Sequence, residues 1–421
     1  MAGPAGRLRR ECTMGGIDRT RLARVAVNWL AEPGNWAAYR MVATDGPVRA
    51  LQRMVDGDVP DPGLRTAVGA RLASGDPWAV AEAAAERAGR LGARIVVPGD
   101  DEWPGPVGDL TRLALDAERR VDRETAPPLC LWVRGHLDLA NALDRAVAVV
   151  GARAASPYGL HVAGELGFGL AERGWTVVSG GAFGIDAAAH RAALNADGTT
   201  VAVLACGLDR PYPAGNTALF DRIADTGLLV SEWLPGQEPL RHRFLIRNRV
   251  IAAGTAGTVL VEAAARSGAT QTMRRALGIG RRAMVVPGPV TSAMSVGCHE
   301  LLRDQPDARL VTGVPHVLEE VGRIGADLAP PVRAPEQPRD RLDDQAAQLL
   351  EAMPRRGPIG LDPLAARAGV DVRTAMRKVA LLEQLGFVVR HDDGYALVPK
   401  SRGSGPPGDR PARPAPADRP A

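Results

Sequence analysis

The sequence predicts a doubly wound α/β domain, and two patterns between residues 145 and 315 support that fold. Apolar runs of four or five residues alternate there with segments of helical periodicity. Runs that are apolar throughout are typical of parallel strands buried on both faces of a sheet. Glycine-rich turns follow the first two runs, as expected where a strand leads into a helix. We therefore expect a Rossmann-like parallel sheet with its core at 145–315.

Each expected strand is an apolar run bounded by turn-forming residues. Helices are expected after the first two core strands, over 158–173 and 185–196. The core strands are expected at 146–150, 176–179, 200–204, 228–231, 258–261 and 282–286, with two more upstream at 93–97 and 129–135.

Changes in composition divide the chain into further segments. Residues 17–90 have helical periodicity interrupted by turns with Pro and Gly, which predicts a small helical N-terminal domain before the α/β domain at 91–325. A Pro-rich stretch at 326–340 indicates a linker. Three helical segments and a hairpin signal at 341–400 then predict a C-terminal winged-helix domain. A leader and a tail, both expected to be disordered, complete the chain at 1–16 and 401–421.

The overall composition is ordinary for a soluble protein. Hydrophobic residues make up 45% of the chain and charged residues 24%, and the net charge is only +4. This balance does not by itself indicate a nucleic-acid partner. No apolar run approaches the ~20 residues that a membrane helix needs. The four cysteines are far apart and lack the CxxC spacing of metal sites, so we expect a cytoplasmic protein without metal or membrane attachment.

The loops that leave the carboxyl ends of the strands hold the candidate binding residues, because ligands of open α/β sheets lie there. The first loop contains Gly151, Arg153 and Ser156. Arg153 stands where the dinucleotide fingerprint has its second Gly, which argues against NAD and favours a single phosphate. A plain strand-to-helix turn with a solvent-exposed arginine is the alternative.

The second loop, 179–186, begins with Ser179, Gly180 and Gly181. Small residues at the start of a helix leave backbone N–H groups accessible to an anion. Tight packing of the strand against the helix is the alternative reason for these glycines. Asp186 is expected to cap the helix.

A third segment, 241–249, holds four arginines and one histidine, and we expect it to form a basic surface. An aromatic ring lies among these charges, a combination typical of sites for single-stranded nucleic acid, whose bases are free to stack. The candidate residues of this segment are Arg241, Arg243, Phe244, Arg247, Asn248 and Arg249.

The loop that follows the strand at 258–261 offers Ser267 and Gly268 to a phosphate. Glu262 is the one plausible general base, but the sequence shows no metal-ligand cluster, Ser–His pair or second carboxylate at a fixed spacing from it. A Walker A motif is also missing. Many anion-binding groups with few acid–base groups favour a binding protein without a cofactor over an enzyme.

Short motifs follow one another in order through these loops. They are Gly-Ala-Arg at 151–153, Ser-Gly-Gly-Ala-Phe-Gly-Ile-Asp at 179–186, Tyr-Pro-Ala-Gly-Asn at 212–216 and Phe-Leu-Ile-Arg-Asn-Arg at 244–249. The series resembles the bacterial DNA-processing protein A (DprA/Smf) family. The resemblance implies a homodimer that binds and shields single-stranded DNA and helps to load the RecA recombinase during natural transformation. It also implies that Arg153 grips a phosphate, with these residues around the same pocket: Ser179, Gly180, Arg241, Arg243, Phe244, Arg247 and Asn248.

Two other functions stay open at this point. A nucleoside-monophosphate phosphoribohydrolase of the lysine-decarboxylase-like family has a similar sheet and a Gly-Gly-x-Gly-Thr loop, which residues 254–258 match in part, ahead of Glu262. A transcription regulator would instead place Arg373, Arg377 and Lys378 of the winged helix on duplex DNA.

Overall fold

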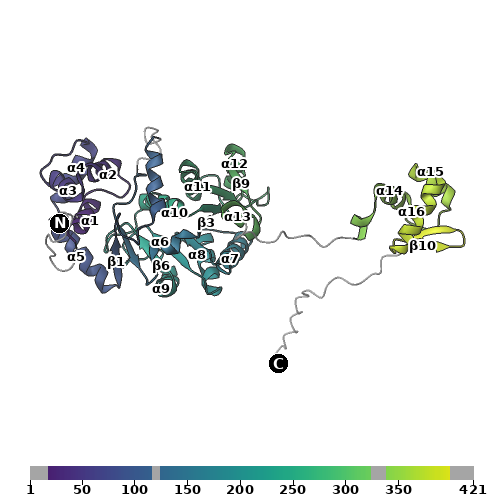
Figure 1. Cartoon of the computed structure of the whole chain (residues 1–421), viewed down its shortest axis with the longest axis horizontal. Helices are drawn as coiled ribbons and strands as arrows, with labels where there is room; N and C mark the ends of the chain where they lie inside the picture. Colours follow the sequence, from purple (N-terminus) through teal and green to yellow (C-terminus); the bar gives the residue numbers. More distant parts are fainter. Residues whose placement is uncertain (1–17, 116–123, 324–337, 399–421) are drawn as a thin grey trace, which may run out of the picture. The chain divides into compact units, whose positions relative to one another are not determined.

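The computed structural model describes residues 18–115, 124–323 and 338–398 (Figure 1). Contacts within the chain divide it into two compact units, with the division between positions 330 and 331 of the sequence. The predicted leader and tail, and residues 326–337 of the predicted linker, lie outside the described residues. Every helix in the described ranges is too short or too polar to span a membrane.

A nine-stranded sheet forms the centre of the first unit. Its order is β1-β2-β6-β5-β4-β3-β7-β8-β9. All neighbouring pairs from β6 to β9 are parallel, whereas β2 runs antiparallel to both β1 and β6. The predicted doubly wound, mostly parallel sheet is confirmed, and β9 adds to the predicted set. The strands are β1 (Ala93–Val96), β2 (Leu131–Arg134), β3 (Ala146–Val150), β4 (Thr176–Ser179), β5 (Thr200–Leu204), β6 (Leu228–Ser231), β7 (Gly257–Leu260), β8 (Arg282–Val285) and β9 (Ala308–Leu310).

Helices cover both faces of this sheet, as strands that are apolar on both sides require. One face packs against α6 (Leu139–Asp144), α10 (Arg241–Ala253), α11 (Ala269–Gly278) and α12 (Val296–Asp304). The other face packs against α7 (Pro157–Ala171), α8 (Ile185–Asn195), α9 (Thr217–Thr226) and α13 (Val314–Val321). The unit also contains two 3₁₀ helices, η1 (Gly105–Leu115) and η2 (Ala214–Asn216).

The strand order reverses between β3 and β7. The chain winds outward from β3 through β4, β5 and β6, and α10 then carries it back to β7 on the other side of β3. The helices that follow β3 and β7 therefore lie on opposite faces. Such a reversal opens a crevice at the carboxyl ends of the two strands, where doubly wound proteins bind their ligands.

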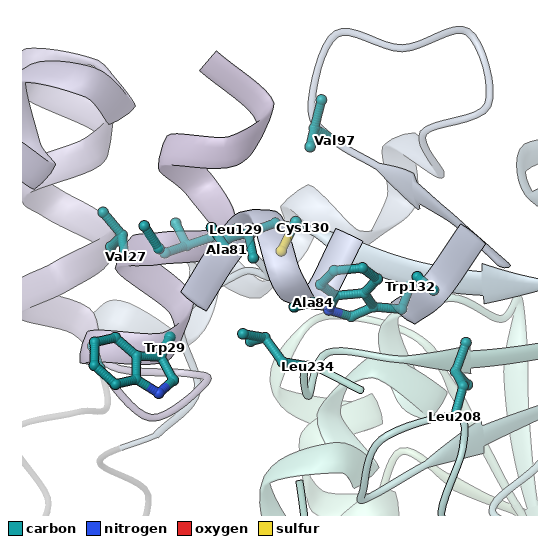
Figure 2. Close-up of a cluster of buried hydrophobic side chains, with 14 of the residues drawn as sticks. Val27, Trp29, Ala81, Ala84, Val97, Leu129, Cys130, Trp132, Leu208 and Leu234 are labelled. Carbon is teal, nitrogen blue, oxygen red and sulfur yellow. The ribbon is translucent and has the colours of Figure 1, made fainter. Parts of the chain in front are cut away.

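The N-terminal helices belong to the same unit as the sheet. They are α1 (Arg19–Leu30), α2 (Trp36–Asp45), α3 (Pro47–Val55), α4 (Pro62–Leu72) and α5 (Pro77–Arg90). Predicted turns separate the first four, and an additional turn separates α4 from α5. Asp18, Asn35, Asp61 and Asp76 cap four of them through their side chains. Figure 2 shows the buried cluster in which α1 and α5 meet β2 and the loops after β5 and β6: Val27, Trp29, Ala81, Ala84, Trp132, Leu208 and Leu234.

The second unit contains the predicted three helices and hairpin. It begins with a short 3₁₀ helix, η3 (Pro338–Arg341). The helices enclose a small apolar core that includes Leu349, Leu364 and Val379. Its assignment as a winged helix stays a prediction. The elements are α14 (Asp344–Ala352), α15 (Leu361–Ala368), α16 (Val372–Gln384), β10 (Val388–His391) and β11 (Gly394–Leu397).

Candidate functional site

A cavity of about 240 Å³ lies at the carboxyl ends of β3 and β7, where the strand order reverses. The loops after β3, β4 and β7 line it, together with one side of α10 and the first turn of α11. The structure therefore brings together predicted residues from three separate segments of the chain. Those that line the cavity are Gly151, Arg153, Phe244, Arg247, Asn248, Ser267 and Gly268.

Arg153 is the exposed cation of this cavity. Its guanidinium carbon lies 4.9 Å from the centroid of the Phe244 ring, within the range of a cation–π contact. Among the described residues, no carboxylate or hydrogen-bond acceptor pairs with the guanidinium. Its N–H groups are thus free to bind an anion from solution.

Arg247 forms the buried wall behind Arg153. It donates hydrogen bonds to the carbonyl of Gly180 at 2.8 Å and to the carbonyl of Val203, and its Nε donates to Asn248 at 3.0 Å. Burial lowers the pKa of Arg247 to about 10, Asp186 opposes this effect, and repulsion from Arg153 adds to it. An anion in the cavity would offset both the burial and the repulsion.

Donor groups of the loop after β4 already bond to acceptors inside the protein. The loop therefore presents fewer donors to a ligand than the sequence predicts. The buried carboxylate of Asp186 accepts from the N–H of Gly180 at 3.2 Å and of Ala182 at 3.4 Å. Burial raises the pKa of Asp186, against the effect of Arg247. Ser179 is fully buried and donates to the carbonyl of Val149 at 2.7 Å. The prediction that Ser179 and Gly180 offer donors to a phosphate is therefore wrong.

The glycines of this loop serve close packing, the alternative that the sequence left open. A Cβ at Gly180 would overlap the guanidinium of Arg247. Gly181, with φ of +67°, similarly leaves room for the ring of Phe220. Gly184 is the N-cap of α8, and Asp186 lies in the first turn of the helix rather than at the predicted cap.

The segment 241–249 is not the basic surface that its composition predicts. It forms the first part of α10, in which Arg243, Arg247 and Arg249 are buried and only Arg241 is an exposed arginine. Charged side chains are seldom buried unless they are paired, and each of these three has acceptors inside the protein. Three of the predicted residues do not line the cavity and are therefore absent from the site: Arg241, Arg243 and Arg249.

The buried arginines outside the cavity hold α10 in place. Arg243 donates to Glu32 of the N-terminal region at 2.7 Å. Arg249 donates hydrogen bonds to both carboxylate oxygens of Glu232, and the bond from Nη2 to Oε1 is 2.7 Å long. It also donates to the carbonyl of Ala126 at 2.8 Å. These contacts connect the helix that carries Phe244 to three distant parts of the chain.

Glu262 pairs with Ser156, although the sequence showed no partner for it. It accepts from the N–H of Ser156 at 2.9 Å and also from its hydroxyl. The same hydroxyl accepts from the N–H of Gly159 at 3.1 Å and so caps α7. Ser156 thus orients the loop that carries Arg153, instead of lining the cavity as predicted, and the buried Glu262 is likewise outside the lining.

Comparison with known proteins identifies the family. A family model described as DNA recombination-mediator protein A matches residues 94–322, which include every loop of the cavity. The chain belongs to this family. The predicted DprA/Smf resemblance is therefore confirmed.

The similarity to individual relatives extends beyond the region that the family model matches. This chain is compared with three of them. It is 43% identical to a DprA protein of Mycobacterium tuberculosis over 390 residues, which cover 91% of this chain and 95% of the relative. It is 36% identical to protein Smf of Escherichia coli over 276 residues, 64% of this chain and 72% of that one. The X-ray structure of DNA processing protein A from Streptococcus pneumoniae matches with a TM-score of 0.58 at 30% identity, covering 73% of this chain and 100% of that chain.

Some lining residues of this family member were absent from the prediction. Leu245, Ile251 and Thr272 contribute apolar or small side chains to the cavity. The positions 244, 248 and 251 have helical spacing, so treating 241–253 as a helix would have found the side of α10 that faces the site. Among the described residues, no three His, Cys, Asp or Glu side chains gather as metal ligands would.

Proposed function

We propose that this protein binds single-stranded DNA in the cavity between β3 and β7 and acts in DNA processing for recombination. One observation carries the proposal: the free guanidinium of Arg153 lies over the ring of Phe244 at the point where the strand order reverses. A free cation can bind a phosphate, and an aromatic ring beside it can stack a base. Membership in a family described as recombination mediators supports the same conclusion.

A single strand suits this cavity better than a duplex. Phe244 is half-buried, and its ring can reach only a base that has left a helical stack. Arg247 lies behind Arg153 and adds positive potential for one phosphate without reaching outward along a duplex groove.

We propose a binding protein rather than an enzyme. Both carboxylate oxygens of Glu262 accept hydrogen bonds from Ser156, which supports a role in holding the loop and not in proton transfer. Asp186, the carboxylate within the cavity, accepts from two N–H groups of its own loop. Neither arrangement resembles a general base poised at a substrate, which favours a binding protein over the phosphoribohydrolase alternative.

The finer part of the proposal follows from family membership. We propose that the protein acts in the cytoplasm as a homodimer, shields incoming DNA during natural transformation and loads a RecA-type recombinase on it. Sedimentation of the purified chain tests the dimer. Strand-exchange assays with RecA on DNA coated by a single-strand-binding protein test the loading, which should accelerate when this protein is added.

The decisive experiment compares wild type with Arg153→Ala. Binding of fluorescent oligonucleotides is measured for a single strand and for a duplex of equal length, at several salt concentrations. We expect wild type to prefer the single strand, and the variant to lose about 10- to 100-fold in affinity, since hydrogen bonds to charged groups contribute roughly 1.5–3 kcal/mol. The slope of log affinity against log salt should fall by about 0.7 for each phosphate that the variant no longer neutralises.

A matched control separates this site from general charge. Arg49 on α3 is also exposed and lies outside the cavity, so Arg49→Ala should bind like wild type. Equal affinity of wild type for duplex and single strand, or an unchanged Arg153→Ala, would refute the proposal.

A further inference from the structure

Exposed aromatic rings gather at one edge of the sheet. The chain has only five Phe and four Tyr, yet Phe183 is 50% exposed and Tyr212 is 45% exposed. Phe183 lies in the loop after β4, and Tyr212 lies in the loop after β5. Leaving large apolar side chains in water forgoes the free energy of burial, so a group of them indicates a surface with a partner.

Tyr212 connects this edge to the cavity through Phe244. The ring centroids of Tyr212 and Phe244 are 5.6 Å apart with an interplanar angle of 61°, an edge-on contact. The segment that follows Tyr212 also lies next to Phe183, since a Cβ on Gly215 would be 3.0 Å from the Cζ of that ring. Tyr212 and Phe244 therefore form an aromatic pair beside Arg153, and Phe183 packs next to Gly215 of the segment that follows Tyr212. We call Phe244, Tyr212 and Phe183, at the carboxyl ends of β4 and β5, the aromatic row.

The chemistry of this row fits nucleobases. Every base has a π face, and stacking on aromatic side chains holds single strands without selecting a sequence. In an edge-on contact the edge of one ring meets one face of the other, so this contact leaves each ring at least one face for a base. Arg153 already lies over the ring of Phe244. A protein partner would equally cover apolar rings, but the row begins at a free cation suited to phosphate, which favours a nucleic-acid strand.

We propose that Phe183 and Tyr212 are base-stacking residues for the strand whose phosphate Arg153 binds. The inference rests on the proposed function and adds a direction to it. From the cavity between β3 and β7, the strand runs over the loops after β4 and β5, away from the loop after β8.

The test uses Phe183→Leu, Tyr212→Leu and the double variant in the full chain. Each binds a single strand that carries 2-aminopurine, whose fluorescence is quenched by stacking, and an abasic strand of the same length. We expect each single variant to lose about 5- to 150-fold in affinity for the base-containing strand, from stacking of about 1–3 kcal/mol per base. Quenching should fall with it, while affinity for the abasic strand and the salt slope stay at wild-type values.

Two controls sharpen the result. Phe168→Leu removes an equally exposed ring, 41% accessible, from α7 and should leave binding unchanged. Tyr212→Trp keeps an aromatic face and should restore most of the affinity and the quenching that Tyr212→Leu loses.

The outcomes separate this inference from the function on which it rests. Wild-type single-strand binding in the double variant would overturn the base-stacking role of Phe183 and Tyr212. It would assign the two rings to a protein-binding surface and leave the proposed function intact. Equal losses on abasic and base-containing strands would also overturn it, because the rings would then only shape the loops. Failure of the wild type to prefer a single strand would instead overturn the proposed function.

Discussion

Arg153 and the buried arginines of α10 have the same side chain in opposite surroundings. Arg153 is exposed, and a phenyl ring is its close partner. Arg243 and Arg249 are buried, and their N–H groups already point to Glu32, Glu232 and backbone carbonyls. Only the first can offer donors to a ligand. The number of arginines in a segment is therefore a poor measure of its capacity to bind anions, and the number of free donors is the better one.

Arg247 lies between these two extremes. It is buried like its neighbours on α10 and donates to two backbone carbonyls, but it also lines the cavity beside Arg153. Its charge can therefore act on a bound phosphate although most of its donors are engaged. The comparison predicts that arginines outside the cavity affect stability, and that the exposed arginine in it affects binding.

The largest effect is expected from the buried ion pair. Arg249→Ala leaves the carboxylate of Glu232, which is 2% exposed, without its cation and should lower the free energy of unfolding by about 3–5 kcal/mol. Denaturation by urea, followed by tryptophan fluorescence, measures it. All seven tryptophans precede residue 331, so their signal reports on the first unit.

The control for this variant removes both charges. Arg249→Met combined with Glu232→Leu leaves no unpaired charge in the core and should be more stable than Arg249→Ala. A single-variant loss below about 1 kcal/mol would mean that water reaches the Glu232 carboxylate, and the contrast between buried and exposed arginines would weaken.

The strands and the exposed arginine were predictable from the sequence, and the buried contacts were not. Apolar runs with glycine turns predict β3 and β4, and the position of Arg153 after β3 puts it at the carboxyl edge. The acceptors of Arg243 and Arg249 come from Glu32 and Ala126, far away along the chain. No local pattern reports such a pairing, so a basic segment and a buried, paired helix have the same sequence signature.

The loop after β4 shows the same limit on a smaller scale. From the sequence alone, its glycines fit an anion site and a tightly packed turn equally well. What decides between them is that Asp186 folds back onto the N–H groups and that Arg247 and Phe220 fill the space beside the glycines. Both depend on packing across the sheet.

A middle-sized effect is expected at the contact between α10 and the N-terminal region. Burial acts to raise the pKa of Glu32, but Trp233, Arg243 and His242 outweigh it, and the pKa lies below its ordinary value of 4.5. A carboxylate with a lowered pKa stabilises the fold above the unfolded pKa, and this contribution is lost as pH falls through the folded pKa. Glu32→Gln should therefore cost about 1–2 kcal/mol of unfolding free energy at pH 7.

The pH dependence distinguishes the charge from the shape of Glu32. The difference between wild type and Glu32→Gln should shrink as the pH of the urea titrations falls below about 4.5 and through the lowered pKa of the folded state, because Glu32 then becomes neutral like glutamine. A difference that is constant from pH 7 to pH 3 would contradict the ionic role. Affinity for single-stranded DNA should change little in folded protein, because Arg243 does not line the cavity.

The smallest effect is expected at Arg241, which is exposed like Arg153 but lies outside the cavity lining. Arg241→Ala should change the free energy of unfolding by no more than about 0.5 kcal/mol. Affinity for single-stranded DNA should fall by roughly threefold at low salt and not at all at high salt, because only a screened, long-range attraction is removed. If this variant instead weakened binding as much as Arg153→Ala, exposure alone would make an arginine a DNA ligand. The ring of Phe244 and the cavity behind it would then have no special part in the site.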